Sequence, residues 1–140
     1  MAERTVVPME IPWQGTWLTW VGATTMCLNA LGEDCDPIDV SGFSGYAFAL
    51  SINEGLCPSG PTMLEWASLG TGVLTSLGRT VKTFFSGDCF VGEFRNDRTR
   101  AHARLAFEMA TREIEAGRPC VVWGLGVPEF GVVRGIEGDE

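Results

Sequence analysis

The fold is decided by Gly117-Arg118-Pro119-Cys120-Val121-Val122-Trp123-Gly124 and the following Val127-Pro128-Glu129-Phe130-Gly131-Val132-Val133-Arg134-Gly135-Ile136. Glycine followed closely by proline is typical of the end of a helix. The β-branched and aromatic residues that come next, interrupted by a glycine-rich segment, predict two strands joined by a turn. This segment therefore predicts a helix stop and then a buried antiparallel hairpin.

Two of the helices predicted upstream of the hairpin have clear apolar stripes. The clearest begins at Asp97 and stops at Gly117, and an earlier one covers about 19–31 and stops at Gly32. Both have apolar residues at helical spacing, and glycine after the last turn is a frequent helix end. The stripes are Trp20, Ala23, Cys27 and Ala30 in the earlier helix, and Ala103, Phe107, Ala110 and Ile114 in the later one.

The middle of the chain has weaker signals. A helix is predicted from about Thr62 to Gly78, because Thr62 and Glu65 have capping-box spacing. We predict short strands over 49–52 and 80–85, an acidic loop over 33–39, and a tight turn that packs Phe43 and Phe48 inward. Together these elements predict one α+β domain over residues 1–140, with helices packed on an antiparallel sheet.

Composition excludes several classes of function. The net charge of -8 disfavours nucleic acid and anionic membranes as partners. The five cysteines form no C-x-x-C pair, and the chain starts without a signal-peptide pattern. We therefore expect reduced thiols and a cytoplasmic location.

No motif indicates a cofactor or a metal. Gly42-Phe43-Ser44-Gly45-Tyr46 lacks the spacing of a nucleophile elbow. Neither Gly70-Thr71-Gly72 nor Gly124-Leu125-Gly126 fits a nucleotide-binding loop. His102 is the only histidine, and Asp34, Asp36 and Asp39 lack the spacing of a calcium loop. We expect neither a cofactor nor a metal.

Arg98, Arg100 and Arg104 lie in the first turns of the predicted helix that begins at Asp97. Cations there oppose the helix dipole, so an acidic partner is expected nearby. An ion pair within the chain and a bound anion are the two interpretations.

Three segments together resemble the papain-like cysteine peptidase superfamily. They are the first helix ending at Leu31-Gly32, Ser44-Gly45-Tyr46-Ala47-Phe48, and residues 117–135, with weaker support from 57–66. The similarity is to a branch of uncharacterised bacterial proteins related to double-glycine leader peptidases and butirosin-type acyltransferases. It covers most of the chain and implies a papain-like core.

The resemblance also implies a cleft without the usual catalytic pair. In active relatives the nucleophilic cysteine opens the first helix and the catalytic histidine begins the last strand. The matching positions hold Thr19 or Trp20 and Glu129, while Gln14 matches an oxyanion-hole glutamine and Ser44 is a further lining candidate. A threonine hydroxyl needs a stronger base than a carboxylate. We therefore expect a non-catalytic domain that binds a peptide or a small ligand.

Two alternatives remain open. A thiol-dependent acyl- or peptide-transfer enzyme would use a loop cysteine, Cys57 or Cys89. An assembly module would instead pair through the sheet edge after Ile136, for example with a second copy. Related chains continue beyond the hairpin with more strands and the third catalytic group, so the resemblance implies a C-terminally truncated domain with an exposed edge.

Overall fold

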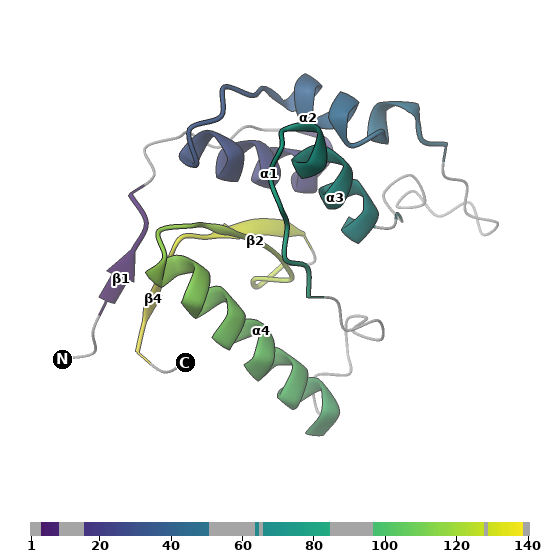
Figure 1. Ribbon diagram of the computed structural model, residues 1–140. Helices are drawn as coiled ribbons and strands as arrows, with labels where there is room; N and C mark the ends of the chain where they lie inside the picture. Colours follow the sequence, from purple (N-terminus) through teal and green to yellow (C-terminus); the bar gives the residue numbers. More distant parts are fainter. Residues whose placement is uncertain are drawn as a thin grey trace. The chain divides into compact units, whose positions relative to one another are not determined.

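The computed structural model describes residues 4–8, 16–50, 64, 66–84, 97–127 and 129–138 (Figure 1). They form two compact units, one from the described parts of 1–34 and 84–140, the other from those of 35–83. The elements in chain order are β1 (Arg4–Val6), α1 (Thr19–Ala30), α2 (Pro37–Phe43), the 3-10 helix η1 (Tyr46–Phe48), α3 (Trp66–Ser76), α4 (Asp97–Glu115), β2 (Cys120–Trp123), β3 (Phe130–Val133) and β4 (Gly135–Glu137).

The predicted hairpin is confirmed. β2 and β3 pair antiparallel, with Cys120 opposite Val133 and Trp123 opposite Phe130. The connecting turn needs glycine, because Gly124 has a φ of 83° and Gly126 a φ of 99°, values that other residues rarely adopt. The Gly124 N–H donates to the Glu129 carbonyl at 2.9 Å and closes the turn.

The strand after the hairpin has a partner within the chain. β1 pairs antiparallel with β4, so Thr5 lies opposite Ile136, and Figure 1 shows the first and last strands side by side. The Val7 N–H extends this pairing by donating to the Arg134 carbonyl at 2.7 Å. One edge of the strand that contains Ile136 is therefore occupied, contrary to the expectation of an exposed edge there. Pairing between copies of the chain stays a prediction.

α1 is the central helix of the first unit and confirms the prediction over 19–31. Its buried residues are Trp20, Val21, Gly22, Ala23, Thr24, Thr25, Cys27 and Leu28. A helix buried on most of its circumference must be covered by other elements. α1 lies against both β2 and β3. Gly32, with a φ of 87°, follows the helix end as predicted.

α4 confirms the other predicted helix of this unit. It ends at Glu115, two residues before Gly117, whose φ is 75°. Ile114 is 2% exposed and forms a core with Val7, against which side chains from α1, β3 and β4 pack. The apolar stripe is thus buried at its C-terminal end, while Ala103 near the other end is exposed.

In the second unit, α2 corrects the predicted acidic loop. The Asp36 carboxylate accepts hydrogen bonds from the N–H groups of Ile38 and Asp39 at 2.7 and 2.8 Å. The Asp39 carboxylate accepts one from the Asp36 N–H at 3.0 Å. This capping box, with Pro37 at the first helical position, starts a helix where the acidic residues predicted a solvated loop.

Other expectations in this unit were also wrong. Ala49 and Leu50 form no strand, nor do residues 80–84. Phe48 is 85% exposed and Phe43 44% exposed, so the predicted inward packing of these rings does not occur. α3 begins at Trp66, while Thr62 and residues 51–52 lie outside the described residues. At the level of class, four α-helices and two small antiparallel sheets in the described residues agree with the predicted α+β fold.

Candidate functional site

The first residue of α1 contacts the start of β3. The Phe130 N–H donates a hydrogen bond to the Thr19 hydroxyl oxygen at 3.1 Å, linking residues 111 positions apart. Leu18 is extended ahead of the helix, and its carbonyl accepts from the N–H groups of Val21 and Gly22 at 3.0 and 3.3 Å. These bonds fix the helix start, so they also fix the position of the Thr19 hydroxyl.

Glu129 lies next to this contact. Its N–H donates to the Val127 carbonyl at 2.7 Å and its carbonyl accepts from Gly124, so the hairpin turn holds its backbone in place. Its side chain is exposed. Thr19 and Glu129, which were predicted to line one cleft, are therefore brought together through the neighbouring residue Phe130.

Of the remaining candidate residues, the structure describes Trp20 and Ser44. Trp20 is 5% exposed and belongs to the core, so its side chain lines no open surface. Ser44 lies in the second unit at the end of α2, where its hydroxyl donates to Ser41 O at 3.1 Å and accepts from Tyr46 N–H at 3.2 Å. Gln14, Cys57 and Cys89 lie outside the described residues.

Exposed apolar side chains surround the tip of the hairpin. The rings of Trp123 and Phe130 meet edge to face, with centroids 4.8 Å apart. Leu125 folds back over β3, since its Cδ1 lies 3.5 Å from where a Cβ on Gly131 would sit. Trp123, Leu125 and Val127 are 49%, 52% and 62% exposed. Sequence reasoning missed these residues, although apolar side chains beside turn glycines could have marked them.

We call the group formed by Thr19, Trp123, Leu125, Val127 and Glu129, which lies at the turn end of the hairpin, the hairpin site. It presents one hydroxyl, one carboxylate and three apolar side chains. Trp17, which is 84% exposed, lies two residues before Thr19 in the sequence. Large exposed apolar side chains can contact a partner or a ligand with apolar groups.

Two of the described thiols, those of Cys27 and Cys120, have raised pKa values. Burial raises the pKa of Cys27 from 9.0 to about 12, with a smaller contribution from the charge of Cys120. Burial also raises the pKa of Cys120, with a further contribution from the Glu113 carboxylate that Arg118 opposes. Since nucleophilic cysteines need a lowered pKa, neither thiol has the environment of a catalytic cysteine.

Two ion pairs within the chain involve charged residues of α4. Arg104 Nε lies 3.2 Å from a Glu108 carboxylate oxygen one helical turn away. Arg118, which follows the end of α4, has its Nε 2.5 Å from a carboxylate oxygen of Glu113. For Arg104 the partner is therefore on its own helix, which favours the ion-pair interpretation over an anion site.

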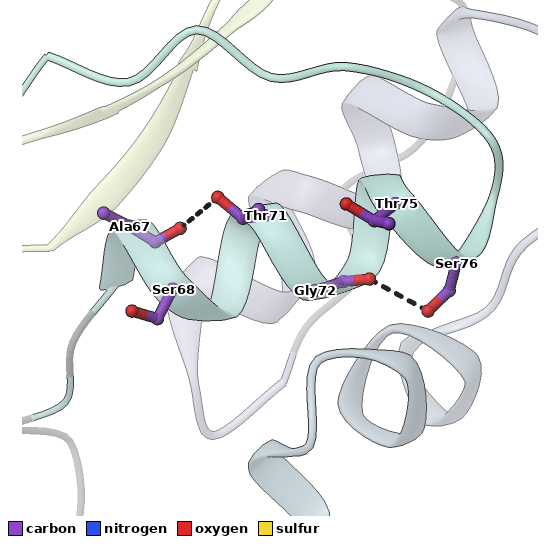
Figure 2. A pocket seen from close by; sticks show the side chains of 6 residues that line it. All are labelled: Ala67, Ser68, Thr71, Gly72, Thr75 and Ser76. Carbon is purple, nitrogen blue, oxygen red and sulfur yellow. Dashed lines mark hydrogen bonds between the residues drawn. The ribbon is translucent and has the colours of Figure 1, made fainter.

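One face of α3 is hollowed and lined by small residues. A cavity of about 620 Å³ is lined by Ala67, Ser68, Thr71, Gly72, Thr75 and Ser76 (Figure 2). The Thr71 hydroxyl donates to Ala67 O at 2.8 Å and the Ser76 hydroxyl to Gly72 O at 2.9 Å. These two hydroxyls are therefore bonded to their own helix, and Ser68 and Thr75 add two more hydroxyls to the lining.

Within the described ranges, no group of three or more histidine, cysteine or acidic side chains is arranged to hold a metal ion. Among the described helices, none combines the length and the apolar character needed to cross a membrane. Comparisons with models of protein families, with characterised proteins and with solved structures gave no match.

Proposed function

We propose that this chain is a catalytically degenerate papain-like domain, acting in the cytoplasm, that binds a peptide or a small ligand at the hairpin site. The observation that carries the proposal is the hydrogen bond from the Phe130 N–H to the Thr19 hydroxyl. It joins the start of the first helix to the start of a hairpin strand, the two places that the resemblance gives to a nucleophile and its base.

Binding is favoured over catalysis by the groups at these two places. The Thr19 oxygen already accepts a hydrogen bond from a backbone amide, which reduces its electron density for attack. Glu129 carries an exposed carboxylate, and carboxylates are weak bases for removing a hydroxyl proton. The pair therefore offers polar contacts to a ligand rather than an activated nucleophile.

The surroundings of the pair suggest the chemistry of the ligand. Leu125 and Val127 are more than half exposed and suit an apolar side chain. The Glu129 carboxylate and the net charge of -8 favour a neutral or basic ligand over an acidic one. A short peptide with one apolar anchor and no acidic residues combines these properties.

A nuclear magnetic resonance titration tests the proposal. The probe is a synthetic leader-type peptide that ends in Gly-Gly, is neutral or basic, and carries leucine near that end. We expect the amide signals of Thr19, Leu125 and Phe130 to shift with increasing peptide, and the peptide to stay intact. Thr19→Val should weaken binding by roughly fivefold to tenfold, because a hydrogen bond contributes about 1 kcal/mol.

Matched variants separate binding from folding. Thr19→Ser keeps the hydroxyl and should keep the affinity. Thr111→Val removes a hydroxyl elsewhere, one that donates to Phe107 O on α4 at 2.9 Å, and should leave the affinity unchanged. Cleavage of the peptide, or shifts that avoid the hairpin site, would overturn the proposal.

A further inference from the structure

The backbone groups of β3 face its two edges in turn, since successive residues of a strand direct their N–H and C=O groups to opposite sides. The Glu129 carbonyl accepts the Gly124 N–H at 2.9 Å, so residue 129 faces β2. The Phe130 N–H faces away from β2, because it donates to the Thr19 hydroxyl at 3.1 Å. Alternation therefore directs the N–H and C=O groups of Val132 to the same edge as the Phe130 N–H, away from β2.

The N-terminal segment bounds this edge at its other end. The Arg134 carbonyl, two residues beyond Val132, accepts the Val7 N–H at 2.7 Å. Residues 130, 132 and 134 thus face one edge, with Thr19 at the first position and Val7 at the third. In the part of the chain that the structure describes, no backbone group pairs with Val132 on this edge. The opening between the two contacts spans four residues of strand, about 13 Å.

The groups in this opening have the chemistry that recognises another backbone. Val132 is half-buried, and buried backbone N–H and C=O groups need hydrogen-bond partners. A donor and an acceptor on one residue of a strand match the acceptor and donor on one residue of an extended peptide. The opening starts at Thr19, which belongs to the hairpin site, and Val132 lies only two residues along the strand from the Phe130 contact.

We propose that a peptide at the hairpin site binds as an added antiparallel strand on this edge of β3, with one of its residues hydrogen-bonded to Val132. The proposal rests on peptide binding at the hairpin site and selects an extended peptide over a small ligand. β2 and β1 already pair antiparallel with β3 and β4 in the same way. Because the bonds are to the peptide backbone, this contact tolerates different side chains in the peptide, and the apolar residues of the hairpin site supply the preference.

Hydrogen exchange of the full chain, read by nuclear magnetic resonance with and without peptide, tests the proposal. The probe is the neutral or basic peptide ending in Gly-Gly that tests the proposed function. The Val132 amide should exchange quickly in the free chain and roughly tenfold more slowly when about nine-tenths of the chain is bound. The Gly131 amide faces β2, so its exchange should not change with peptide. A Val132 amide that is already slow in the free chain would mean that another part of the chain occupies the edge, and would overturn the proposal.

Peptides with one N-methylated residue provide a matched comparison. In an antiparallel added strand, one peptide residue exchanges both bonds with Val132, and the N–H groups of its two neighbours face away from β3. N-methylation of that residue should weaken binding roughly fivefold, because one hydrogen bond is lost, and N-methylation of either neighbour should change it by less than about twofold. Binding that shifts the Thr19 signal but leaves Val132 exchange unchanged would overturn the added strand alone. Absence of any binding would overturn the proposed function as well.

Discussion

At the scale of single residues, Cys27 couples stability to pH. Burial and the nearby Cys120 raise its pKa from 9.0 to about 12, so the folded state holds the proton after the unfolded state has released it. The stabilisation is complete below pH 9 and is lost as the pH rises from 9 toward 12. We expect this thiol to lower the free energy of unfolding by about 1.4 kcal/mol per pH unit in that range.

Urea unfolding of wild type and Cys27→Ala over this alkaline range measures the effect. The wild-type free energy of unfolding should fall more steeply with pH than that of Cys27→Ala. Val40→Ala is a matched control, since it removes buried apolar volume, at a side chain 0% exposed, but no titrating group. It should be less stable than wild type with the same pH slope. Equal slopes for Cys27→Ala and wild type would contradict the assignment.

At the scale of elements, α2 depends on its N-terminal cap. Asp36 accepts from the amides of Ile38 and Asp39, which otherwise have no partner within the helix. Asp36→Ala should therefore weaken α2 by about 1 kcal/mol and speed hydrogen exchange of its amides roughly fivefold. Asp36→Asn keeps the acceptor oxygen and should exchange nearly as slowly as wild type. If exchange were equally fast in both variants, the charge of Asp36, and not its acceptor oxygen, would be what stabilises α2.

Comparison of the elements shows which parts of the fold the sequence could predict. α1, α4 and the hairpin were predicted because their signals are local: apolar periodicity, and glycines such as Gly32 and Gly117 with positive φ. The start of α2 had an equally local signal in Asp36-Pro37 and Asp39, but the acidic residues were interpreted as a solvated loop. The strands predicted over 49–52 and 80–85 relied on side-chain propensity alone, which strand pairing has to support.

The candidate site was predictable only in outline. Thr19 and Glu129 were chosen from the resemblance, and they do lie near one another through Phe130. Trp20 was chosen in the same way, yet its side chain is buried in the core. Ser44 lies in the second unit, and its place at the site stays a prediction. Burial depends on what packs around α1, and that information is spread over distant segments rather than held in the residue itself.

At the scale of the molecule, the first unit is built from both ends of the chain. β1 lies near the start of the sequence and β4 near its end, and they pair directly. Such pairing between distant segments closes a long loop, so local signals cannot predict it and it contributes to stability only when the whole unit forms. This long-range strand pair is the part of the fold that the sequence pattern was least able to predict.

Gly135 is the residue on which this pairing depends. A Cβ there would lie 3.1 Å from the Thr5 carbonyl oxygen and 3.1 Å from Val6 Cγ2, closer than side chains normally pack. The carbonyl belongs to the paired backbone of β1, so it cannot move away without loosening the pair. We expect Gly135→Ala to lower the free energy of unfolding by about 1–3 kcal/mol.

Gly131→Ala, on the preceding strand β3, is the matched control. Its Cβ would meet only Leu125 Cδ1, at an ordinary 3.5 Å, so its stability should stay within about 0.5 kcal/mol of wild type. Denaturant unfolding compares the two variants, and hydrogen exchange locates the change. The Val7 amide, which donates to Arg134 O, should exchange faster in Gly135→Ala alone. Equal stability of the two variants would mean that the β1 backbone can move away from the added Cβ with little loss of stability. The stability of the first unit would then not depend on the pairing of β1 with β4.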